Sequence, residues 1–81
     1  MTDVATWIQE FVAATGGGAL SESDRETILA LAGAAARSSE RTAAPLTCWV
    51  AANAGLSPAD ALQIAHALAE RLADDKPEPN A

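Results

Sequence analysis

The sequence predicts an all-α fold, a compact four-helix bundle, and three observations favour it. Four segments carry apolar residues at helical spacing, and links of about two to six residues join them. Alanine, which has the highest helix propensity, occurs 21 times. Residues that favour strands are few and never alternate with polar ones. Because the links are short, we expect consecutive helices to pack as antiparallel neighbours.

The first helix is expected over residues 3–15. Thr2 or Asp3 can cap its start, and Gly16 can end it in a left-handed conformation. The apolar residues recur at the spacing of a single helical face, which would pack against the other helices. This face carries Val4, Trp7, Ile8, Phe11 and Val12.

The second helix is expected over residues 22–37. Ser21 followed by Asp24 is a variant of the capping box, with a shorter acid than usual. Acidic residues crowd the first turn and Arg37 lies in the last, as the helix dipole favours. The apolar face holds Ile28, Leu31, Ala32 and Ala35, with Leu29 and Ala36 at its edges.

The third helix is expected to begin within the central segment, residues 40–50. Pro45 lacks a backbone N–H group, so it fits the first turn of a helix. Thr42 or Ala44 can cap this helix, and Gly55 can end it. One face of the helix would carry Leu46, Trp49, Val50 and Asn53.

The fourth helix is expected over residues 58–73. Ser57 can cap it, Pro58 suits its first position, and Asp60 suits its first turn. Two aspartates oppose the dipole at its end, so we expect fraying after residue 73. The chain would then comprise a helical domain, residues 1–75, and a disordered tail, residues 76–81. The apolar stripe consists of Ala61, Leu62, Ala65, Leu68, Ala69 and Leu72.

Composition and charge restrict the core and the classes of partner. Eighteen large apolar side chains accompany the alanines, so the helices should approach closely around a thin core. The net charge of −6 and five scattered basic residues disfavour nucleic acid and anionic membrane surfaces. We expect no signal peptide, because no basic region precedes an apolar one at the N-terminus. A single cysteine fits a reducing cytoplasm.

Two side chains offer soft or nucleophilic chemistry, and neither has a second partner in the sequence. His66 is expected at the border of the apolar stripe, and Cys48 as a small buried hydrophobe. Metal sites need three or four ligands, so we expect no metal, no cofactor and no catalytic residue. A carrier protein would need a modified serine, but Ser57 is explained by capping alone.

The turn before the third helix carries two charged residues with two possible roles. Arg41 can reach the carbonyls that end the second helix, while Glu40 lies near the donors that start the third. The pair would then form a structural clamp. Alternatively, Arg41 is an interface anchor, as arginines on turns between helices often are. Trp7 and Trp49 are expected in the core, although so thin a bundle can leave one exposed as a docking point.

The central segment resembles a small bacterial helical domain of unknown function. That family occurs alone or appended to proteins similar to molybdenum-cofactor guanylyltransferases, sometimes near genes for molybdenum-enzyme maturation. Where many relatives carry a histidine, this chain has Ala35-Ala36. The residues that match the recurring pattern are Trp7, Arg41, Ala43, Ala44, Pro45, Leu46 and Thr47.

These observations favour a non-catalytic protein-interaction or accessory module, and the resemblance implies a setting in molybdenum-cofactor delivery or molybdoenzyme maturation. The expected partner is a protein, and the expected partner-binding residues are Glu40, Arg41, Thr47 and Trp49. The alternative is a small structural subunit or a stabilising homodimer, because an alanine-rich core leaves an apolar face available for self-association.

Overall fold

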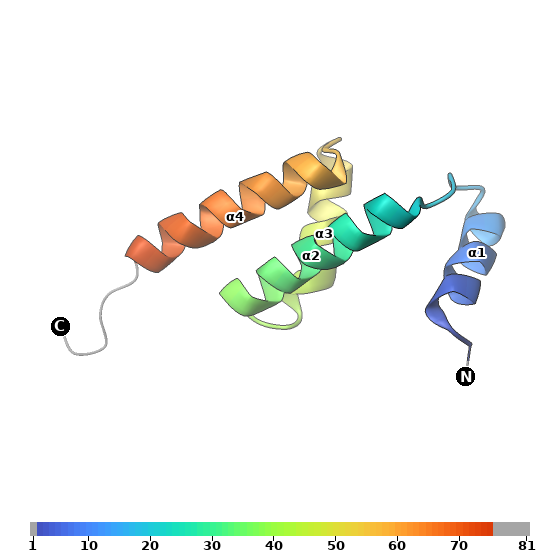
Figure 1. The fold of residues 1–81 in the computed structure, drawn as a ribbon, viewed down its shortest axis with the longest axis horizontal. Coiled ribbons are helices and arrows are strands. Elements are labelled where there is room, and N and C mark those ends of the chain that lie inside the picture. The colour runs from blue at the N-terminus through green and yellow to red at the C-terminus, as the bar shows by residue number, and fades with distance from the viewer. Residues whose placement is uncertain (1, 76–81) are drawn as a thin grey trace.

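A computed structural model describes residues 2–75 of the 81-residue chain. Its four helices are α1 (Val4–Thr15), α2 (Glu22–Ser38), α3 (Ala43–Asn53) and α4 (Pro58–Asp75) (Figure 1). The predicted all-α class and the predicted number of helices are confirmed. The expected disordered tail, residues 76–81, lies outside the described residues, and the division into domain and tail stays a prediction. None of the described helices combines the length and hydropathy needed to cross a bilayer.

Three helices begin at the side-chain caps that the sequence predicts. The oxygens of Asp3, Ser21 and Ser57 each accept a hydrogen bond from the backbone N–H three residues later. The donors are Thr6, Asp24 and Asp60, at 2.8, 3.0 and 3.2 Å respectively. The hydrogen bonds from Thr6 also hold the pKa of the Asp3 carboxyl below its usual value.

The start of α3 depends on the backbone rather than on a cap. Thr42 has a helical backbone, with φ −68° and ψ −16°, and its side chain caps nothing. Instead, the Ala43 and Ala44 N–H groups donate to the carbonyls of Glu40 and Arg41, at 2.9 and 3.2 Å. Pro45 is the third residue of α3, within the first turn, where a missing N–H group costs no helical hydrogen bond. Its predicted position is confirmed.

Glycines end α1 and α3 as expected. Gly16 and Gly55 have φ values of +71° and +77°, which side chains rarely tolerate. After α3, the Leu56 N–H donates to the Ala51 carbonyl at 3.1 Å, and the Gly55 N–H donates to the Ala52 carbonyl at 3.0 Å. These two bonds form a Schellman motif, which satisfies the last carbonyls of α3 and turns the chain into α4. Helix α4 runs to Asp75, two residues beyond the expected end.

Helix α2 lies at the centre of the packing. It packs against both α3 and α4, and no other pair of described helices packs as extensively. Figure 1 shows α2 and α4 running in the same direction, with α3 crossing beside them. The expectation that consecutive helices pack as antiparallel neighbours is therefore wrong for α3 and α4. Each of these two helices packs mainly on α2, because α2 presents alanines that allow close approach.

The core is as thin as the composition predicts. Its buried side chains are Leu31, Ala34 and Ala61, which are 3%, 5% and 4% exposed. Leu31 is the one large side chain among them. Much of the predicted apolar face of α2 is less covered, and Leu29 at its edge is 60% exposed. The packing therefore depends on small residues and on Leu31.

Helix α1 packs loosely beside the start of α2. Ile8 and Val12 are half-buried, and they line a hollow of about 340 Å³ together with Leu20 and Arg25. The predicted face of α1 is thus only partly covered. Trp7 and Phe11 are exposed, and their rings stack with centroids 6.3 Å apart.

We expect Leu31→Ala to lower the free energy of unfolding by about 2–4 kcal/mol, because it leaves a cavity between three helices. Leu29→Ala is the matched control, since it removes the same atoms from a side chain that is 60% exposed. The control should cost less than about 0.5 kcal/mol. Urea denaturation followed by circular dichroism measures both values. Equal losses in the two variants would contradict the central role of Leu31.

Candidate functional site

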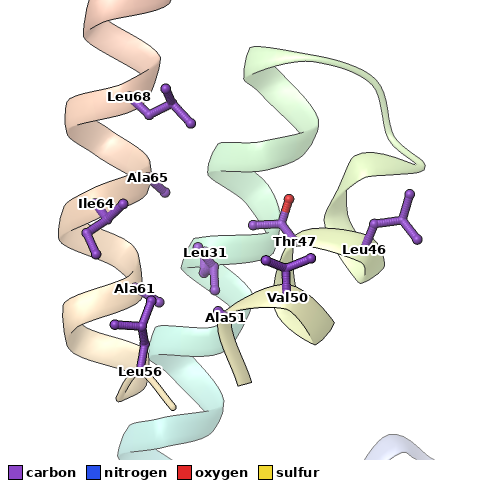
Figure 2. A pocket seen from close by; sticks show the side chains of 10 residues that line it. All are labelled: Leu31, Leu46, Thr47, Val50, Ala51, Leu56, Ala61, Ile64, Ala65 and Leu68. Carbon is purple, nitrogen blue, oxygen red and sulfur yellow. The ribbon is translucent and has the colours of Figure 1, made fainter. Parts of the chain in front are cut away.

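An apolar groove lies between α3 and α4, beside the buried Leu31 and Ala61 of the core. Its volume is about 360 Å³. Leu31 of α2 forms the floor, α3 forms one wall and α4 the other (Figure 2). The lining residues are Leu31, Leu46, Thr47, Val50, Ala51, Leu56, Ala61, Ile64, Ala65 and Leu68. The groove exists because α3 and α4 each pack on α2 and leave the space between them unfilled.

The walls of the groove expose large side chains. On α3, Leu46 and Val50 are 66% and 60% exposed, and on α4, Ile64 and Leu68 are 54% and 42% exposed. Each pair is separated by four residues, which places its members on one side of a helix. These four residues are called the groove walls below. Such a continuous apolar surface is typical of a site that binds another protein.

The lining of the groove contains no charged side chain, and its one polar side chain is Thr47. General acid–base catalysis needs a titratable group within hydrogen-bond reach of the reacting atoms, and this lining offers none. An apolar helical segment, by contrast, would bury its side chains between the walls without leaving a charge desolvated. The groove therefore suits a protein segment better than a polar metabolite.

The structure places the four predicted partner-binding residues at different distances from the groove. Thr47 lines it and is half-buried. Trp49 lies on α3 outside the lining and is 67% exposed. Glu40 and Arg41 are exposed in the turn before α3. The four residues thus occupy one helix and its preceding turn, and only Thr47 belongs to the groove.

The predicted side-chain clamp is not formed in the part of the chain that the structure describes. No hydrogen bond or ion pair there involves the Arg41 or Glu40 side chain. The backbone carbonyls of these two residues make the connection to α3 instead. Both charged side chains consequently extend into solvent, where a partner can reach them.

The expectation that both tryptophans lie in the core is wrong. Trp7 and Trp49 are 59% and 67% exposed. The core of three helices closes with alanines at the contacts, so an indole ring has no space between them. A wide side chain on these helices has to lie outside the helix contacts.

Cys48 and His66 lie apart from the groove. Cys48 is half-buried in a separate hollow of about 110 Å³ beside Ile28 and Leu31, and burial raises the pKa of its thiol. His66 is exposed on α4. Among the described residues, no three histidine, cysteine, aspartate or glutamate side chains gather as a metal site would require.

Sequence reasoning missed Ile64 as part of a surface. The predicted stripe of α4 includes Leu68 but not Ile64, although the two are four residues apart and share a side of the helix. Leu46 and Val50 repeat the same spacing on α3. Two such pairs on helices joined by a short link are the signal that could have indicated paired walls.

We expect a pH dependence from Cys48. Because its thiol pKa is raised in the folded chain, its contribution to stability is fully present below the ordinary thiol value of 9.0 and declines as the pH rises above it. Urea denaturation at pH 8 and pH 10 should show a decline in wild type that is smaller in Cys48→Ala. An equal decline in the free energy of unfolding in both chains would show that the pH dependence does not come from Cys48.

Comparisons with known proteins place the whole chain in one family. Neither the curated proteins nor the solved structures compared with it gave a match. A family model described as a domain of unknown function, DUF6457, matches residues 1–81. The match includes the central segment, both walls of the groove and all four helices. The chain therefore belongs to the DUF6457 family.

Proposed function

We propose that this chain is a non-catalytic protein-interaction module that binds its partner through α3 and the groove beside it. The observation that carries the proposal is the groove itself, which has an uncharged lining and walls that are more than two-fifths exposed. Large apolar side chains that stay exposed to water lower the solubility of a protein. A partner that covers them removes this unfavourable contact with water.

The residues around the groove can act as the anchor and the polar rim of a protein interface. Trp49 extends the apolar surface along α3, and tryptophan is enriched among residues that carry binding energy. Arg41 and Glu40 add charge at the start of the same helix, where they can pair with a polar rim. Thr47 supplies the one side-chain hydroxyl of the groove, which can fix the register of a bound segment.

The setting that we propose is molybdenum-cofactor delivery or molybdoenzyme maturation in the cytoplasm. Its support is the resemblance of residues 41–47 to domains appended to guanylyltransferase-like proteins. An accessory module in such a system would bring an enzyme and its maturation factor together, which requires a binding surface and no chemistry of its own. A role as a small structural subunit is the second candidate, favoured by the thin core.

The variant Val50→Asp tests the groove. A carboxylate in the apolar wall should abolish partner binding, because it would be desolvated without a counter-charge. Leu29→Asp is the matched control, since Leu29 and Val50 are both 60% exposed and Leu29 lies outside the groove. Affinity purification of tagged chains at native expression, with quantitative mass spectrometry, measures the result. Proteins lost with Val50→Asp but retained with the control support the proposal, and identical sets contradict it. Molybdoenzyme maturation proteins among those lost would support the setting.

A second test concerns the turn. We expect Arg41→Ala to change the free energy of unfolding by less than about 0.5 kcal/mol, because the exposed guanidinium contacts none of the described residues through a polar bond. Binding of the partner identified above should nevertheless weaken by about tenfold, as for the loss of an interface arginine. Calorimetric titration and urea denaturation separate the effects. A loss of more than about 1 kcal/mol in the free energy of unfolding, with unchanged binding, would instead support the role of Arg41 as a structural clamp.

A further inference from the structure

We infer that the partner on the groove face is a second copy of this chain. In the dimer, α4 of each copy lies along the groove of the other, and the two α4 helices run antiparallel about a two-fold axis. The inference rests on the proposed function, because it names the occupant of the same surface. It requires that the face be complementary to itself, and the sequence of α4 along this face meets that requirement.

An exposed strip of α4 beside the groove carries a charge at each end and apolar residues between the charges. Asp60, Ile64, Leu68 and Arg71 follow one another at intervals of four, four and three residues, which keeps them on one strip of the helix. All four side chains are exposed. The strip therefore presents a negative end, an apolar middle and a positive end over about 16 Å of helix.

An antiparallel pairing matches this pattern to itself. A two-fold axis that passes midway between Asp60 and Arg71 sets each aspartate opposite the arginine of the other copy. Ile64 and Leu68 then meet their counterparts around the axis, where the interface is driest. A parallel pairing would set like charges against each other at both ends, which is unfavourable.

The second wall of the groove completes the contact. Leu46 and Val50 of α3 flank the space that the α4 helix of the other copy would occupy, and Leu31 lies beneath it (Figure 2). The lining brings no charge into this space, so the net charge of −6 on each copy stays outside the buried part. A strongly basic partner would gain little here, because the strip carries one charge of each sign.

The side of α3 and α4 that borders the groove leaves large apolar side chains in water. Leu46 and Ile64 are 66% and 54% exposed there, and Val50 and Leu68 are 60% and 42% exposed. A second copy would cover this apolar surface, whose burial favours association.

The mass of the full chain in solution is the first test. Sedimentation equilibrium should give twice 8.2 kDa at about 100 µM, which is well above the expected Kd of about 1 µM. Ile64→Asp should give the monomer mass with an unchanged circular dichroism spectrum, because the substituted side chain is exposed in the monomer. Leu29→Asp should stay dimeric.

Charge reversal tests the antiparallel register. Asp60→Arg and Arg71→Asp should each raise the dimer Kd by about tenfold or more, because each creates two like-charge contacts. Mixing the two variants in equal amounts should restore the wild-type Kd, since both contacts then join opposite charges. A misfolded variant could not be rescued in this way.

Three results would overturn the inference. They are a wild-type chain that is monomeric at every concentration, a dimer that persists in Ile64→Asp, and a mixture of the two charge-reversal variants whose dimer Kd stays raised. The affinity purification described above answers a different question. A monomeric chain whose partners depend on Val50 would retain the proposed function and exclude the second copy, whereas a dimer that recovers no other protein would identify the second copy as the whole partner.

Discussion

The contact of Leu31 with the helices on either side of α2 is the constraint on which the fold depends. Among the described residues it is the one large side chain that is buried, and it lines hollows that both α3 and α4 border. Ala34 and Ala61 let the backbones approach but contribute little apolar area. Two helices that each pack on a third need not meet each other, so the space between them stays open as a groove.

The same shortage of large buried residues explains why the surface is apolar. Leucines and tryptophans that would fill the core of a thicker bundle lie on the outside of this one, as Leu46 and Trp49 do. Large apolar side chains that remain in water after folding favour association, because burial against a second protein removes their apolar surface from water. The thin core and the exposed apolar surface, which favours association, therefore both follow from one alanine-rich sequence.

Local structure could be predicted from the sequence, and packing could not. Ser57 and Gly55 fix the ends of their helices through contacts within a few residues, so their roles follow from the chain alone. The exposure of Trp49 depends on which helix α3 packs against, which no local pattern encodes. Thr47 is the one predicted binding residue that lines the groove, and Ile64 lines it although the predicted stripe of α4 does not include it. Helical periodicity reports that a face is apolar and does not report what covers it.

Helix α3 exposes large apolar side chains in two directions. Val50 belongs to the wall of the groove, and Trp49, one residue earlier, projects about 100° away around the helix. A second copy seated in the groove would cover Val50 and leave Trp49 open, together with Arg41 at the start of the helix. In the dimer proposed above, the central segment of each copy would stay free for another protein while the groove holds the second copy. Two such segments in one symmetric dimer would bind a partner with a higher effective concentration than either alone.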